Sequence, residues 1–126
     1  MNKTILLTGL VFGVLAIVLG AFGAHGLKKV LTVDELSSFE TGVKYQMYHA
    51  LFLMLLSILS LNAATKKPVF YLITFGVILF SFSIYLLATR TVTGIDFRKI
   101  GWITPIGGLM LILGWGYLFF AVLTKK

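Results

Sequence analysis

Long hydrophobic stretches alternate with short polar segments along the chain, and this pattern sets its organisation. Four stretches, near residues 4–24, 43–61, 68–89 and 104–123, approach the roughly 20 helical residues that cross a hydrocarbon core of about 30 Å. Little sequence remains between them for a separate water-soluble domain. The pattern predicts an all-α membrane protein, a bundle of four transmembrane helices that forms a single domain over residues 1–126.

The polar segment after the first span has its own helical signal. Thr32 and Glu35 stand three residues apart, which is the spacing of a capping box at a helix start. Hydrophobic residues then recur at three- and four-residue intervals: Val33, Leu36, Phe39 and Val43. We therefore predict a short amphipathic helix on the membrane surface between spans 1 and 2. It either stands alone or continues into the second span with a bend near Gly42.

Small residues form stripes on the first and last spans. Those of the first span fall on one helical face: Gly9, Gly13, Ala16, Gly20 and Ala24. Those of the last span are Gly107, Gly108 and Gly114. Small residues let neighbouring backbones approach closely, and close packing holds helices together in lipid. We predict two helix-packing faces that pack against each other, although glycine is also simply common in membrane spans.

Composition agrees with a membrane protein and narrows its partners. Hydrophobic residues make up 59% of the chain and charged residues 12%, with a mean hydropathy of +1.01, which excludes an ordinary soluble globule. The net charge of +7 comes from basic residues at helix ends rather than from one basic stripe, which argues against nucleic-acid binding. We interpret Lys66–Lys67 and Lys125–Lys126 as anchors to anionic lipid headgroups, worth about 1 kcal/mol for each side chain.

Lysine and arginine counts suggest an orientation for the chain. An even number of spans places both termini on one side of the membrane. If Lys44 and Arg90 are set aside as parts of the helices, that side holds five lysines against four basic residues on the other. Because basic residues are enriched in cytoplasmic loops, this small excess favours cytoplasmic termini.

Polar side chains gather near the opposite membrane face, where the first and third spans end and the second begins. Ionisable groups are costly within a span and usually pair inside the bundle. We predict one polar cluster made of His25, Tyr45, Gln46, His49, Tyr85 and Arg90. Either Glu40 or Asp96 is expected to neutralise Arg90.

Two functions from different classes fit this cluster. In the first, the protein is a non-enzymatic binding or transport-related bundle whose cluster meets a lipid headgroup or a small anionic ligand. In the second, the cluster only fixes helix register, and the glycine faces assemble the protein with itself or with another membrane protein. No nucleophile-plus-base motif and no phosphate-binding glycine loop indicates an enzyme. Two histidines and no cysteine fall short of a zinc site, so we expect neither a metal nor another cofactor.

Four segments resemble the small bacterial membrane proteins of domain-of-unknown-function family 423: GAFGAHGLKK (20–29), TGVKYQMYHAL (41–51), FSFSIYLL (80–87) and ITPIGGLMLILGW (103–115). The resemblance covers almost the whole chain in order. It implies a four-span inner-membrane protein and brings no activity with it. One position departs from the family pattern, because Phe82 stands where a small residue is usual.

Overall fold

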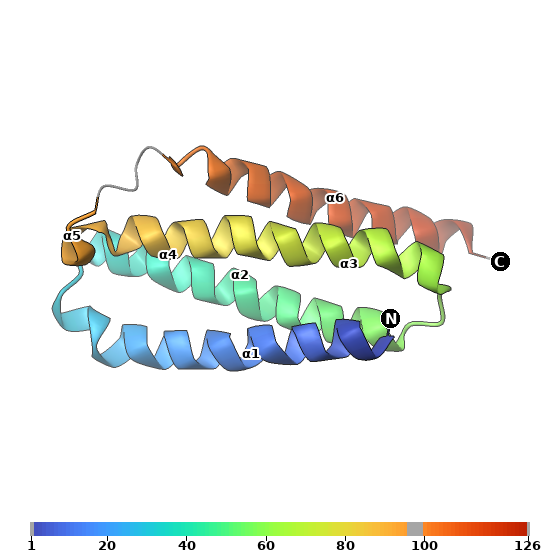
Figure 1. Cartoon of the computed structure of the whole chain (residues 1–126), viewed down its shortest axis with the longest axis horizontal. Helices are drawn as coiled ribbons and strands as arrows, with labels where there is room; N and C mark the ends of the chain where they lie inside the picture. Colours follow the sequence, from blue (N-terminus) through green and yellow to red (C-terminus); the bar gives the residue numbers. More distant parts are fainter. Residues whose placement is uncertain (1, 96–99, 126) are drawn as a thin grey trace.

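The computed structural model describes residues 2–95 and 100–125, and none of these residues forms a β-strand. The long helices are α1 (Asn2–His25), α2 (Val33–Ile58), α3 (Ala63–Val77) and α6 (Ile103–Thr124). The short elements are the 3₁₀ turn η1 (Leu27–Lys29), the π-helical segment η2 (Ile78–Phe82), α4 (Ser83–Ala88) and α5 (Arg90–Thr93). The segments α3, η2 and α4 follow one another without a break and form one long rod (Figure 1).

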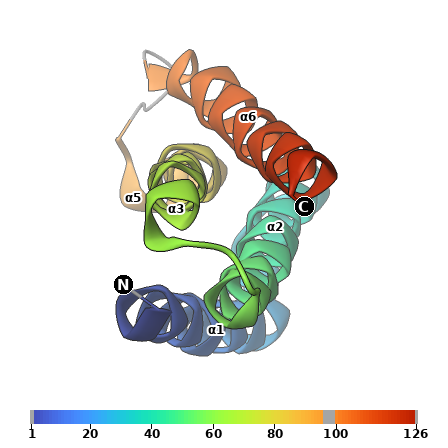
Figure 2. The ribbon, with the colours of Figure 1, turned by 90° about the vertical axis from the view of Figure 1, so that its right-hand side faces the viewer.

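This rod and the helices α1, α2 and α6 lie side by side along the long axis of the molecule, with both termini toward the same end (Figure 1). Viewed end-on, α1 and α6 occupy opposite edges, with α2 and α3 between them (Figure 2). Helix α1 packs chiefly on α2, and α6 packs chiefly on α3 and η2. The first and last long helices therefore pack on different neighbours, and α2 also reaches α6 through the Phe52 and Trp115 rings, with their centroids 4.5 Å apart.

The small-residue face of α1 packs against α2, as close packing in lipid requires. A Cβ atom on Gly9 would lie 2.8 Å from the Ala50 carbonyl oxygen, so a larger residue cannot fit there. Gly13 and Gly20 continue the same contact and Ala16 is buried between them, whereas Ala24 is exposed and Gly23 takes its place against Phe39. The small residues of α1 thus face α2, with Gly23 in the position expected for Ala24.

The glycines of α6 have a different partner from the one that the sequence suggested. A Cβ atom on Gly107 would collide with the backbone of Phe80 in η2, and one on Gly114 would lie 2.6 Å from the Ile73 side chain of α3. Gly108 faces the Phe80 ring. The prediction that the two glycine faces pack against each other is wrong, because α1 and α6 are kept apart by α2 and α3.

The π-helical segment is where the rod touches both of its neighbours closely. On one side, Gly107 approaches its backbone. On the other side, the Ser81 hydroxyl donates to the Gly42 carbonyl oxygen of α2 at 2.8 Å and is fully buried. Single π-helical turns frequently mark positions where a helix departs from regular geometry for a specific contact.

The segment after the first span differs from its prediction. The capping box is confirmed, because the Thr32 hydroxyl accepts from the Glu35 backbone N–H and the Glu35 carboxylate accepts from that of Thr32. The helix that it starts is not a separate surface helix, however, since α2 continues without interruption to Ile58. By length and hydropathy, three segments could cross a membrane: Asn2–Lys29, Ala63–Ala88 and Ile103–Thr124. The four-span count is not established by this criterion, which α2 does not meet.

Candidate functional site

Gln46 of α2 joins three helices through one amide group. Its side chain is fully buried, and its Nε2 donates to the Phe12 carbonyl oxygen of α1 at 2.8 Å. Its Oε1 accepts from the Tyr85 hydroxyl of α4 at 2.6 Å. The Tyr85 ring packs over Gly42, where a Cβ atom would lie 2.7 Å from a ring carbon. Because both ends of the amide have partners, Gln46 fixes the register of α1, α2 and α4.

His49 lies one turn further along α2 and reaches the fourth long helix. Its Nδ1 is 2.6 Å from the Tyr45 carbonyl oxygen, and its Nε2 is 3.0 Å from Nε1 of Trp115 on α6. An indole N–H can only donate, so Nε2 accepts and Nδ1 carries the hydrogen. The ring is therefore neutral, and neither nitrogen remains free for a metal or haem iron.

Two members of the predicted cluster lie outside this network. His25 is the last residue of α1 and is exposed, and its side chain makes no hydrogen bond within the described part of the chain. The Tyr45 side chain is 41% exposed, and its ring lies against Phe80, with the ring centroids 5.0 Å apart. The prediction of one cluster is thus wrong for His25, whereas the Tyr45 ring stays beside His49, with the ring centroids 6.4 Å apart, and makes no side-chain hydrogen bond within the described residues. Gln46, His49 and Tyr85 lie close together, while Arg90 belongs to a separate site.

Arg90 lines a cavity of about 570 Å³ between the start of α2, the end of α4 and the start of α6. Its polar lining consists of Thr32, Asp34, Glu35, Ser38, Arg90, Thr91 and Thr104. The rest of the lining is aliphatic side chains, glycine and proline, and includes Ile84, Leu87 and Pro105. We call this space the loop-end cavity, because it lies at the end of the molecule away from the termini.

Opposite charges face the loop-end cavity. Glu35 is 6% exposed, and its Oε2 accepts from the Thr91 hydroxyl at 2.6 Å. This hydrogen bond, followed by the one from the Thr32 backbone and a smaller attraction from Arg90, lowers the pKa of Glu35 below its usual 4.5. The carboxylate is therefore ionised at neutral pH. The Arg90 guanidinium donates from Nη1 to the Leu87 carbonyl oxygen at 2.7 Å, which holds it at the end of α4.

The carboxylate beside Arg90 is not the one that the sequence suggested. Glu40 is exposed on α2, and Asp96 lies outside the described residues. Glu35 takes this position because α2 begins at the end of the molecule where α4 stops. The capping-box spacing identified Glu35 as a helix-start residue, and pairing that signal with the antiparallel order of the helices could have placed it beside Arg90.

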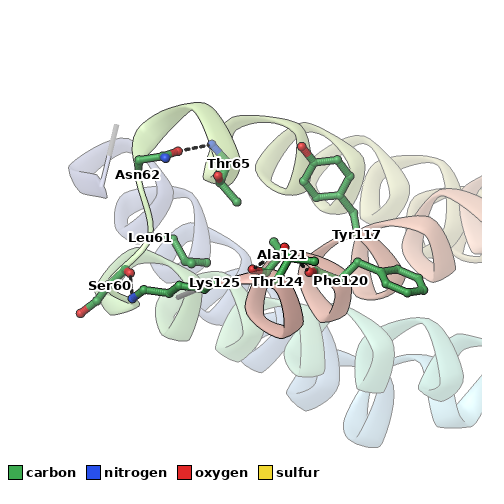
Figure 3. Close-up of a pocket in the computed structure, with 9 residues that line it drawn as sticks. All are labelled: Ser60, Leu61, Asn62, Thr65, Tyr117, Phe120, Ala121, Thr124 and Lys125. Carbon is green, nitrogen blue, oxygen red and sulfur yellow. Dashed lines mark hydrogen bonds between the residues drawn. The ribbon is translucent and has the colours of Figure 1, made fainter.

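A second polar pocket, of about 540 Å³, lies at the opposite end (Figure 3). It is bounded by the turn between α2 and α3 and by the last turns of α6, and Lys125 Nζ donates there to the Ser60 carbonyl oxygen. Nearby, Lys66 is only 1% exposed, and its Nζ donates to Asn2 Oδ1 at 2.9 Å and to the Ser57 carbonyl oxygen at 3.2 Å. The interpretation of Lys66 as a headgroup anchor is therefore wrong, although its neighbour Lys67 is exposed.

Comparison with known sequences gives consistent matches. Residues 19–108 match the family described as "Protein of unknown function (DUF423)". The UPF0382 membrane protein SSP2132 of Staphylococcus saprophyticus is 40% identical over 114 residues, which cover 90% of this chain and 91% of the relative.

More distant relatives extend the match across bacteria. The UPF0382 membrane protein YwdK of Bacillus subtilis is 38% identical, covering 90% of this chain and 88% of the relative. The UPF0382 inner membrane protein YgdD of Escherichia coli is 30% identical, covering 99% of this chain and 93% of the relative. No solved structure matches the chain significantly. The names of these relatives and the three apolar helical segments agree on a multi-pass membrane protein.

Proposed function

Since the chain belongs to the DUF423 family of membrane proteins, whose function is unknown, we propose a function from its own geometry: it binds a phospholipid headgroup at the loop-end cavity and catalyses no reaction. The observation that carries this proposal is the position of Arg90, which lines a polar cavity where apolar helices end. Headgroups occupy this depth in a bilayer, where the apolar part of a helix gives way to its polar ends.

The chemistry of the cavity suits a phosphate group. A guanidinium presents five N–H donors and forms short, charge-assisted bonds to phosphate oxygens. Within the described part of the chain, one of these donors is used, by the Leu87 carbonyl oxygen, which orients the group and leaves others for a ligand. Ser38 and Thr104 line the same space, although the Thr104 hydroxyl is hydrogen-bonded to that of Ser83 at 2.6 Å. The aliphatic residues Ile84 and Leu87 supply an apolar wall for the start of an acyl chain.

The interior network supports a structural role for the remaining polar residues. Gln46 and His49 have their polar side-chain atoms paired with groups of this chain. A ligand could reach them only by breaking these bonds, so they favour the view that this part of the predicted cluster fixes helix register. Ligand binding is therefore assigned to Arg90 and its surroundings.

We include α2 as the fourth span. It has 26 residues, or about 39 Å of helix, which exceeds a hydrocarbon core of about 30 Å. Its polar residues Gln46 and His49 are buried inside the protein, whereas exposed positions of its second half carry Tyr48, Leu51 and Ile58. Part of its low hydropathy thus comes from buried side chains that would not meet lipid. The exposed charged residues of α2, Asp34, Glu40 and Lys44, all lie in its first half, toward the loop-end cavity.

We propose that both termini lie in the cytoplasm. Because Lys66 is buried, however, the count falls to four basic residues on each side and no longer favours either orientation. A direct test is available because the chain has no cysteine. A single cysteine added after residue 126 should be labelled by a membrane-impermeant maleimide only in inverted vesicles. Labelling in intact cells would instead show that the termini lie outside the cytoplasm.

Assembly through the predicted glycine faces is less well supported. Gly9, Gly107 and Gly114 contact other helices of the same chain, so they are not available to a second protein. A homo-oligomer or a complex with another membrane protein would need a different surface.

The proposed function is tested by native mass spectrometry of the protein extracted from its own membranes in a mild detergent. We expect a retained phospholipid mass that Arg90→Ala removes. Lys67→Ala, which removes an exposed cation at the other end, is the matched control and should leave the mass unchanged. Equal retention by the wild type and Arg90→Ala would exclude the loop-end cavity as the binding site.

A further inference from the structure

We propose that the headgroup bound at the loop-end cavity is that of an aminophospholipid, with a phosphodiester on Arg90 and a primary ammonium on Glu35 and Asp34. This inference rests on the proposed function and adds the class of lipid. Its basis is that the described residues lining the cavity include one guanidinium and two carboxylates, which a purely anionic headgroup does not require.

The carboxylate of Glu35 has acceptor capacity left for a ligand. Its Oε1 accepts from the Thr32 backbone N–H at 3.0 Å, and its Oε2 accepts from the Thr91 hydroxyl at 2.6 Å. A carboxylate offers about four lone-pair sites on its two oxygens. Counting the bonds from the described residues, each oxygen can therefore accept one further N–H. Asp34 adds a second negative charge at the rim of the cavity, where it is exposed.

Other common headgroups fit this charge pattern less well. A glycerol headgroup carries the phosphate charge alone, and it would hold a net negative group beside two carboxylates, an unfavourable juxtaposition. A choline headgroup carries a quaternary ammonium without N–H donors, and such groups are typically recognised by aromatic side chains. No aromatic residue is found among the described residues that line the cavity. A primary ammonium can donate to the carboxylates directly.

The size and position of the cavity agree with this ligand. Its volume of about 570 Å³ lies within the roughly 300–1,000 Å³ that is typical of small-molecule sites. The aliphatic side chains of Ile84 and Leu87 lie on the α4 side, and Pro105 begins the apolar part of α6. A headgroup would thus meet charge within the cavity while its acyl chains followed the apolar helices.

The test uses the full chain, stripped of lipid in detergent and then equilibrated with equal amounts of phosphatidylethanolamine, phosphatidylglycerol and phosphatidylcholine that share the same acyl chains. We expect native mass spectrometry to show phosphatidylethanolamine bound at least tenfold more than either other lipid. Glu35→Gln with Asp34→Asn should reduce this preference to less than twofold. Glu35→Gln keeps a capping-box acceptor, since glutamine also serves at this position, so α2 should still form.

Control variants distinguish failure of the aminophospholipid inference from failure of the proposed headgroup site. Glu40→Gln removes an exposed carboxylate of the same helix outside the cavity and should leave the preference intact. Two outcomes would overturn the inference of an aminophospholipid and leave headgroup binding standing. One is equal binding of phosphatidylglycerol; the other is an unchanged preference in the double variant while Arg90→Ala still removes all lipid. Retention of lipid by Arg90→Ala would overturn both. Displacement of the lipid by an equal concentration of water-soluble glycerophosphoethanolamine would show that the ligand is the free headgroup compound rather than a membrane lipid.

Discussion

The two ends of the molecule each hold a cation beside the last turn of a helix, and they use it differently. Lys66 donates to the Ser57 carbonyl oxygen near the end of α2, and Arg90 donates to the Leu87 carbonyl oxygen near the end of α4. Both contacts suit the negative end of a helix. Lys66, however, is buried and also bound to Asn2, whereas Arg90 is half-buried and faces a cavity with carboxylates. A cation enclosed by its own chain stabilises the fold, and one that faces a cavity is available to a ligand.

The strongest test of this comparison is Lys66→Ala against Lys67→Ala. Removing the buried Lys66 side chain should lower the free energy of unfolding by about 2–5 kcal/mol, as for other long buried side chains. Lys67 is exposed, and its removal should change the free energy by less than about 0.5 kcal/mol. Titration with SDS in mixed micelles measures both values. A similar loss in the two variants would mean that Lys66 is not enclosed.

The region between the two ends is tested by Gln46→Leu. This change leaves the Tyr85 hydroxyl without its acceptor, and burial of an unpaired polar group costs about 1–3 kcal/mol. Tyr85→Phe removes that hydroxyl as well. The double variant should therefore lose less stability than the sum of the two single variants. Strict additivity in the same SDS titration would show that the two side chains are not coupled.

A smaller effect is expected at the helix start beside the loop-end cavity. Thr32→Ala removes the oxygen that accepts from the Glu35 backbone N–H at 3.1 Å. Loss of such a cap typically costs about 1 kcal/mol. Thermal unfolding followed by circular dichroism should record a lower midpoint, and Thr32→Ser, which keeps the hydroxyl, should restore it. No recovery with serine would indicate that the methyl group matters more than the cap.

The smallest effect on stability should come from Arg90→Ala. A cation at an exposed helix end contributes about 0.3–1 kcal/mol. We therefore expect this variant to lose about 0.5 kcal/mol of stability in the SDS titration while losing its bound lipid. Lys66→Ala should show the reverse, with lower stability and unchanged lipid retention per folded molecule. If both variants lost the same property, the contrast between the two ends would fail.

Much of the helical framework could be predicted because its signals are local. The hydrophobic stretches predicted the long helices, and Thr32 and Glu35 predicted the start of α2. The α1 glycines indicated a close helix contact. The partner of each face was harder to predict. A glycine stripe specifies a close neighbour without naming it, so Gly107 could not reveal that its neighbour is the backbone of Phe80.

The site was predicted less completely, because the depth of a residue in the membrane does not specify which neighbouring helix its side chain faces. His25 and His49 were both assigned to one cluster, yet His25 is exposed and His49 faces Trp115. Gln46 was assigned to the same cluster and is buried, but one of its partners is the Phe12 carbonyl oxygen, a backbone group that side-chain patterns cannot indicate. The burial of Lys66 was also hidden, because a lysine pair at a span end usually indicates an anchor.

The polar character of α2 has a consequence for how the protein is made. As the chain leaves the ribosome, α1 comes first, so the Phe12 carbonyl oxygen is already present when Gln46 follows. The other partners of α2, Tyr85 and Trp115, are translated later. We therefore expect α2 to leave the translocon together with α1, and a nascent chain that stops near residue 62 to hold α2 less firmly in the bilayer than the finished protein does.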